Sequence, residues 1–114
     1  MTANIRAAAV LTVALLISAC ATEATSQYYR PRGQDQNWEV SGELHKATRK
    51  VTIRINGAEA LTGTLSWLSL EGDFRGTYRG HPVAASCHNV EKWLSSYVRC
   101  DVLIDNEKAA SLVF

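Results

Sequence analysis

The residues that could carry out catalysis are few and lie around one short segment. Asp73, His81 and Ser86 are an acid, a histidine and a serine close enough in sequence to suggest a nucleophilic triad. Nothing like the sharp turn that presents a nucleophile surrounds Ser86, and Glu71 with Asp73 is typical of a solvated turn. No glycine-rich phosphate loop is present in the sequence. The sequence therefore predicts a protein without catalytic residues, metal or cofactor.

The N-terminal segment has the pattern of an export signal. Arg6 provides a positive charge, and residues 7–17 form an apolar stretch shorter than the roughly 20 residues that span a bilayer. Ser18 and Ala19 are small, as a signal peptidase requires. Residues 16–20 (LISAC) resemble the lipobox of bacterial lipoproteins, in which aliphatic and small residues precede a cysteine.

This resemblance implies that residues 1–19 are removed and that Cys20 becomes the lipidated first residue of the mature protein. A diacylglyceryl thioether and an acylated amino group, with chains such as palmitate, would anchor it, because each buried methylene contributes about 0.8 kcal/mol. In this family the residue after the cysteine influences sorting, and Ala21 is not the aspartate that resembles an inner-membrane signal. We therefore expect an outer-membrane lipoprotein facing the periplasm. The alternative is a secreted chain in which Cys20 is incidental.

The two remaining cysteines then form an even pair in an oxidising compartment. Cys87 and Cys100 have the same inward parity on their expected strands, so their side chains point to the same face. A disulfide between them would close a short loop and contribute about 3 kcal/mol. Two free thiols, or a metal pair with His81 or His88, are the alternatives, but two thiolates alone make a poor zinc site. We predict the disulfide and no metal site.

Four side chains are candidates for contact with a partner. Trp93 lies in the longest expected loop, residues 88–96, where it is either a lid on the core or an exposed anchor. Arg54, Arg75 and Arg79 have outward parity on neighbouring hairpins. If those strands are adjacent, the arginines form a polar face suited to a carboxylate-rich partner, although sheet exteriors are commonly of this kind.

Charge excludes one class of partner. The chain has 12 Lys and Arg and 11 Asp and Glu, so loss of Arg6 with the signal leaves a formally neutral mature chain. No basic excess points to nucleic acid. Residues 45–50 (HKATRK) form a short basic loop that could meet a lipid phosphate or an anionic glycan, or could be a solvated connection between strands.

Hydrophobic periodicity predicts the fold. From residue 37 onward apolar and polar residues alternate, which is typical of half-buried strands, and Trp67 is expected on a core face. Asn56-Gly57 is a strong hairpin turn. A first strand and three strand–turn–strand segments are expected at 38–44, 49–66, 73–88 and 98–114. We therefore predict an all-β fold, a small antiparallel sandwich or meander barrel of about seven strands with one disulfide.

The chain divides into three expected parts, which are a signal peptide (1–19), a lipidated tether (20–36) and a β domain (37–114). The tether is polar without strand or helix period, and it could hold the domain up to roughly 50 Å from the bilayer.

These features predict a membrane-anchored envelope lipoprotein whose β domain binds a partner or supports an envelope assembly, without catalysis. Its expected partners are the membrane, through Cys20, and a protein or other envelope component, but no nucleic acid. The alternative is a lipid-anchored inhibitor of a lytic enzyme such as lysozyme. Some lysozyme inhibitors are small lipid-anchored β barrels with a disulfide, although this chain has no clear match to their loop motifs.

Overall fold

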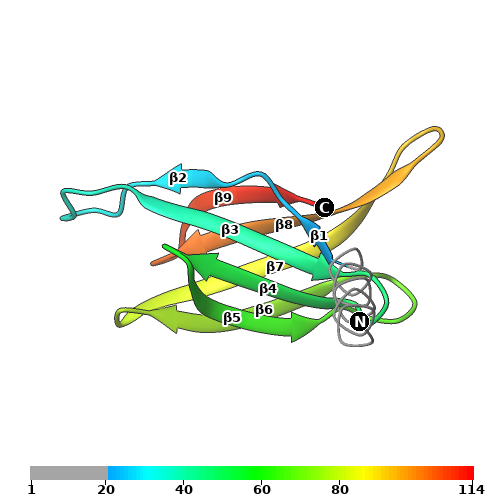
Figure 1. The fold of residues 1–114 in the computed structure, drawn as a ribbon, viewed down its shortest axis with the longest axis horizontal. Helices are drawn as coiled ribbons and strands as arrows, with labels where there is room; N and C mark the ends of the chain where they lie inside the picture. Colours follow the sequence, from blue (N-terminus) through cyan, green and yellow to red (C-terminus); the bar gives the residue numbers. More distant parts are fainter. Residues whose placement is uncertain (1–20) are drawn as a thin grey trace, which may run out of the picture.

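The computed structural model describes residues 21–114, and within this range the chain forms nine antiparallel strands in two sheets (Figure 1). The strands are β1 (Ala21–Glu23), β2 (Gln27–Tyr29), β3 (Trp38–His45), β4 (Lys50–Ile55), β5 (Ala58–Thr64), β6 (Gly72–Tyr78), β7 (His81–Glu91), β8 (Ser96–Ile104) and β9 (Glu107–Val113). The prediction of an all-β antiparallel fold is confirmed, with nine strands in place of about seven.

The two sheets enclose one core. One sheet has the order β1-β3-β4-β5, with β2 also paired to β3, and the other is a meander of β6-β7-β8-β9. The three expected hairpins are β4–β5, β6–β7 and β8–β9. Alternate side chains of both sheets point inward, and the largest fully buried ones are Val40, Val51, Ile53, Ile55, Val83, Cys100, Val102, Ile104 and Leu112.

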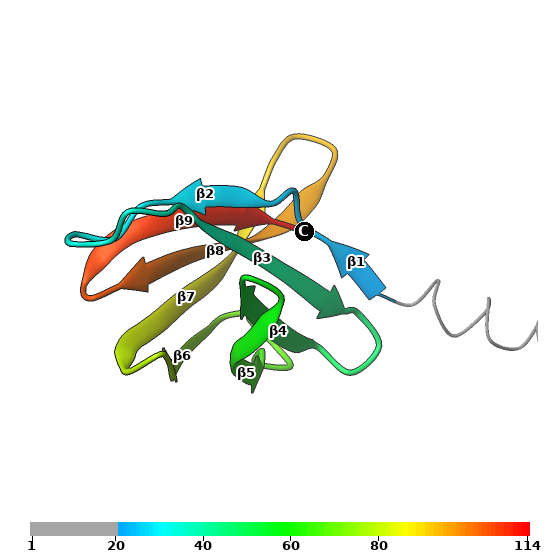
Figure 2. The same cartoon turned by 60° about the vertical axis from the view of Figure 1, so that its left-hand side comes forward.

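On one side the sheets meet where β5 contacts β6 (Figure 2). A register shift between Ile53 and Arg54 leaves Ala60 as an extra residue of β5, which bends that strand. A side chain on Gly76 of β6 would collide with the backbone carbonyl of Ala60. The close approach of the two sheets on this side therefore requires glycine at position 76.

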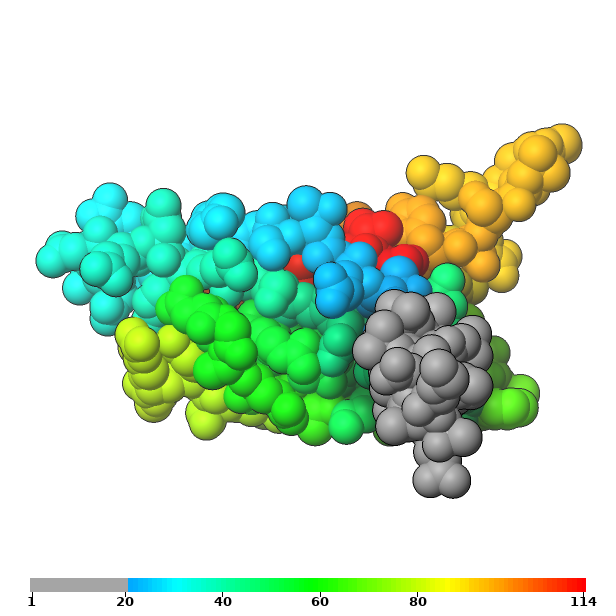
Figure 3. Space-filling model, in the orientation of Figure 1, coloured from blue at the N-terminus to red at the C-terminus, as the bar shows by residue number. Residues whose placement is uncertain are grey.

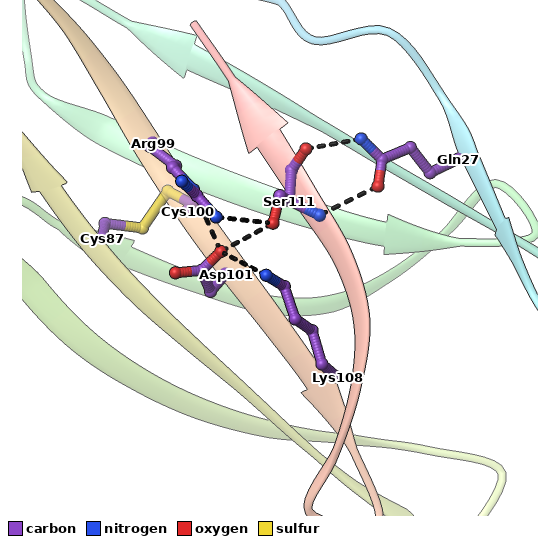
Figure 4. Close-up of polar contacts among 7 residues, drawn as sticks. All are labelled: Gln27, Cys87, Arg99, Cys100, Asp101, Lys108 and Ser111. Atoms are coloured by element: carbon purple, nitrogen blue, oxygen red, sulfur yellow. Dashed lines mark hydrogen bonds and ion pairs between the residues drawn. A yellow bond between two sulfur atoms is a disulfide. The ribbon is translucent and has the colours of Figure 1, made fainter. Parts of the chain in front are cut away.

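On the other side, side chains of β2 bond to β9, and Gln27 makes two of these hydrogen bonds. The Gln27 Nε2 donates to the backbone carbonyl of Ser111 (2.5 Å), and the Ser111 backbone N–H donates to the Gln27 Oε1 (2.9 Å) (Figure 4). The amide of Gln27 thus pairs with the free edge of β9 as a neighbouring strand would. It satisfies backbone groups that a sheet edge otherwise leaves unpaired.

The expectation of a tether without strands over residues 20–36 is wrong in part, because this segment contains strands β1 and β2. Ala21 pairs with His45, and Tyr29 pairs with Trp38, along the same edge of β3. The Tyr29 hydroxyl also donates to Glu107 of β9 (2.8 Å). Short edge pairings and side-chain bonds hold this segment, and neither produces an alternating pattern that sequence analysis detects. The expected signal peptide and Cys20 lie outside the described residues.

The connections differ between the two ends of the domain. At one end the turns of β4–β5, β6–β7 and β8–β9 each have two central residues of positive φ, as type I′ turns require. These pairs are Asn56-Gly57, Arg79-Gly80 and Asp105-Asn106. The connection between β2 and β3, residues 30–37, also lies at this end (Figure 1). At the opposite end, loops of four to seven residues join β3 to β4, β5 to β6 and β7 to β8 (Figure 1). We call this second end, with residues 46–49, 65–71 and 92–95, the long-loop end.

The predicted disulfide between Cys87 and Cys100 is confirmed. The two residues face each other across β7 and β8, and both are buried in the core. The expected loop over 88–96 is wrong in part, because β7 continues to Glu91 and pairs with β8 as far as Ser96. The disulfide therefore staples the middle of this long hairpin, at the fifth of its nine residue pairs.

Because the Gln27 amide joins the two sheets, Gln27→Glu should destabilise the domain in a way that depends on pH. At pH 7 the new carboxylate would face the Ser111 carbonyl without a donor, so we expect a loss of about 2–3 kcal/mol in the free energy of unfolding. At pH 4 the protonated carboxyl can donate again, so most of this loss relative to the native protein should disappear. Urea unfolding at both pH values measures it. Gln27→Ala is the control, because alanine cannot donate at either pH and its loss of stability should persist at pH 4. An equal loss for Gln27→Glu at both pH values would contradict the proposed role of Gln27 in joining the sheets.

Beside this closure a polar cluster covers the outer face of β8 and β9 (Figure 4). The Asp101 Oδ1 accepts from the Ser111 hydroxyl (2.7 Å) and from the Arg99 Nε (3.2 Å), and the Lys108 Nζ lies 3.7 Å away. Burial raises the pKa of Asp101, but the Ser111 hydrogen bond and the charges of Arg99 and Lys108 outweigh burial and hold the pKa below its ordinary value of 3.8.

This lowered pKa makes stability depend on pH. The ionised Asp101 contributes stability that is fully present above pH 3.8 and is lost as the pH falls through the lower pKa of the folded state. Asp101→Asn should therefore be less stable at pH 7 and should lose less stability during acidification from about pH 5 to pH 2. Circular dichroism during acid titration measures both effects. Asp35→Asn, on an exposed loop, is the control and should follow the native curve.

Candidate functional site

A cavity opens at the long-loop end of the domain. Its volume is about 240 Å³, equivalent to several water molecules and near the lower limit for small-molecule sites. The lining combines an apolar set with a polar set. The apolar residues are Leu44, Leu65, Leu70, Val98 and Phe114, and the polar ones are Lys46, Arg49, Asn89, Ser96 and Tyr97.

Two of the lining residues have a left-handed backbone. Arg49 has φ 60° and Leu70 has φ 55°. Each ends a single helical turn, because the N–H of Arg49 donates to the His45 carbonyl (2.6 Å) and that of Leu70 to the Ser66 carbonyl (3.0 Å). Neither residue type is favoured at positive φ, and such backbone strain is concentrated at functional sites.

Two residues of the lining also carry a buried polar atom without a partner. In the described part of the chain, the Arg49 Nε and the Asn89 Oδ1 are the buried side-chain nitrogen and oxygen atoms that make no hydrogen bond. Leaving such a group unpaired costs about 1–3 kcal/mol. Both residues line the same cavity, so one molecule bound there could accept from Arg49 and donate to Asn89.

The charge of the lining is positive. Among the described residues around the cavity, Lys46 and Arg49 are cationic and no side chain is acidic. The Arg49 guanidinium carbon lies 4.1 Å from the centre of the Trp67 ring, which holds this cation in place from the solvent side. A backbone bond from the Leu65 N–H to the Arg49 carbonyl (2.9 Å) connects the two loops that carry them. The site is suited to an anionic group attached to an apolar body.

The residues considered for a triad are not assembled. Asp73 faces Ser86 across β6 and β7, but His81 lies at the far end of β7, roughly 17 Å away at the usual rise per residue. The His81 Nδ1 is instead 2.7 Å from the Asp105 Oδ2. Within residues 21–114 no group of three or more His, Cys, Asp or Glu side chains could hold a metal ion. Over the same range no helix is long and apolar enough to cross a membrane.

The predicted partner-binding residues lie in separate places. Arg54 on β4 pairs with Glu43 (2.9 Å), Arg75 lies on β6 in the other sheet, and Arg79 lies in the β6–β7 turn. Trp93 is 93% exposed at the tip of the β7–β8 hairpin, which projects from the body of the domain (Figure 3). The interpretation of Trp93 as a lid on the core is therefore wrong. Its role as an anchor for a partner stays a prediction.

Sequence reasoning missed part of this site. Arg49 belongs to the basic loop 45–50 that the sequence indicates, but the burial of its Nε depends on contacts with residues 65–71. Asn89 has no sequence signal, because a single asparagine in an alternating strand is unremarkable. Trp67 was expected on a core face, yet it is 73% exposed because β5 ends at Thr64 and the chain leaves the sheet there.

Comparison of this chain with protein-family models, with curated proteins and with solved structures gives no match. The interpretation of the site therefore depends on its own geometry.

The unpaired Arg49 Nε predicts an unusual result for Arg49→Gly. Glycine relieves the positive φ and removes the buried donor, so the variant should be at least as stable as the native protein. Arg79→Gly is a matched control, because Arg79 also has positive φ (49°) and also lies against an aromatic ring, that of Tyr78.

The difference between these two variants isolates the buried donor. Arg49→Gly should be more stable than Arg79→Gly by about 1–2 kcal/mol in urea unfolding. A lower stability for Arg49→Gly than for Arg79→Gly would mean that the Arg49 side chain stabilises the fold and is not held for a ligand.

Proposed function

We propose that this protein is a lipid-anchored lipoprotein of the bacterial outer membrane whose β domain binds an amphiphilic molecule without catalysing a reaction. The lipobox-like residues 16–20 support the anchor and the periplasmic location. The single observation that carries the binding function is the pair of buried, unpaired polar atoms, the Arg49 Nε and the Asn89 Oδ1, in one cavity with apolar walls.

The chemistry of the cavity defines the ligand. Arg49 and Lys46 favour an anionic head group, and the Asn89 oxygen requires a hydroxyl or amide donor near it. Leu44, Leu65 and Val98 favour an apolar body. An acyl chain joined to a small anionic head that also carries a donor satisfies all three requirements, as in an N-acyl amino acid or a fragment of a membrane lipid.

The polar groups of the cavity are the reason for proposing binding without catalysis. Each polar group of the cavity acts through a hydrogen bond or a fixed charge, and such groups hold and orient a ligand. A role in holding or presenting a lipid-like molecule therefore fits the side chains better than a role in its conversion.

Two separate measurements test the anchor and the ligand, mass spectrometry on the full chain and calorimetry on the β domain. The full chain, expressed in a Gram-negative host and extracted from its membranes, should yield an N-terminal peptide that begins at an acylated Cys20 in mass spectrometry. Residues 21–114 contain both sheets, the core and the disulfide, and this unit serves for calorimetric titration. N-octanoylglycine should bind at least about tenfold more tightly than its uncharged amide, a difference of 1.4 kcal/mol.

The two arginine variants provide the control for binding. Arg49→Gly should remove the preference for the charged probe, and Arg79→Gly should keep it. Equal binding of both probes to the native domain would contradict the proposed ligand class. A chain with an intact Met1 and no fatty acid would contradict the proposed anchor.

A further inference from the structure

We propose that the long-loop end docks directly onto an anionic lipid bilayer through two apolar tips, Trp67-Leu68 and Trp93-Leu94. The inference goes beyond ligand binding, because it assigns a second surface with its own partner. It rests on the proposed lipid anchor only for bringing the domain to the membrane.

The two tips are the most exposed large apolar side chains of this end. Trp67 is 73% exposed and Leu68 is 91% exposed, and Trp93 and Leu94 are 93% and 89% exposed. Large apolar side chains in contact with water at adjacent positions mark a surface for a partner or a membrane. Tryptophan favours the membrane interface, where its ring is apolar and its N–H remains hydrated.

Both tips arise from loops whose bases line the cavity. Leu65 and Leu70 flank the first tip in sequence, and Asn89 and Ser96 flank the second. The cavity mouth therefore lies between two apolar projections. Figure 1 shows the loop after β5 and the hairpin between β7 and β8 at the same end of the domain, with the hairpin extending furthest.

The start of β1 places the anchor at this same end. Ala21 pairs with His45, the last residue of β3, immediately before the loop 46–49. Cys20 directly precedes Ala21 in the sequence, so a lipid on it would be attached one residue before this strand. A lipid on Cys20 would hold the long-loop end against the bilayer, with no free tether between them.

The charge of the three loops fits an anionic membrane surface. Residues 46–49, 65–71 and 92–95 carry the cations Lys46, Arg49 and Lys92 against one acid, Glu71. Basic residues near an anionic bilayer favour binding, and aromatic residues beside them insert at the level of the head groups. A lipid surface therefore matches these loops in both charge and apolar character.

The test uses the lipoprotein extracted from membranes and reconstituted into vesicles that contain phosphatidylglycerol and lipids with brominated acyl chains. Bromine quenches tryptophan fluorescence at short range. The native chain should lose about half or more of its fluorescence relative to vesicles without bromine. The double variant Trp67→Phe with Trp93→Phe retains the buried Trp38 as its tryptophan, and its fluorescence should be unchanged by bromine.

The outcomes separate this inference from the proposed function. An acylated Cys20 without quenching of the native chain overturns the docking and leaves the anchor intact. Quenching that is equal in the native chain and the double variant also overturns it, because the signal then comes from Trp38. Asn89→Ala removes a polar group of the cavity and none of the loop cations, so it should weaken probe binding and retain the quenching, and the two losses are distinguishable. A protein crosslinked at Trp93 with no quenching would assign this surface to a protein partner.

Discussion

The shared core of the two sheets is the constraint on which the other features depend. Alternation along the strands gives each sheet one apolar face, and these faces bury each other where the sheets pack face to face. Close backbone approach at Gly76 closes one side, and the side-chain amide of Gln27 closes the other. Because the core is closed on both sides, the connections between the strands lie at the two ends of the domain. One has the three type I′ turns and the β2–β3 connection, and the other has the three loops around the cavity.

The two ends also differ in the strain that they contain. At the end with tight turns, the turn residues with positive φ are Asn, Asp or Gly, which tolerate it, except for Arg79. At the long-loop end, Arg49 and Leu70 adopt the same backbone without that tolerance, and Arg49 also leaves a donor unpaired. Arg49 thus combines an unfavourable backbone with an unpaired donor, which supports the proposal that this site is retained for binding and not for stability.

The sequence was sufficient where burial creates a pattern. Alternation predicted the strands that carry Ile53 and Val102, the Asn56-Gly57 turn, and the common parity of Cys87 and Cys100. Prediction failed for the features of the structure that tertiary contacts determine. Strands β1 and β2 are three residues long and are held by edge pairing and by the Gln27 side chain, so they have no alternating signal. The unpaired state of Arg49 and Asn89 depends on how loops from both sheets meet, and no local pattern contains that information.

The replacement of a free tether by paired strands changes what an anchor at Cys20 would do. A flexible tether would let the domain present any face to the membrane. With Ala21 paired to His45, rotation about the attachment point is restricted, and the cavity and both apolar tips lie at the attached end. An amphiphile could then pass from the bilayer to the cavity between apolar surfaces, without exposing its acyl chain to water. Because each methylene kept from water is worth about 0.8 kcal/mol, this geometry would lower the barrier to lipid capture by keeping the acyl chain out of water.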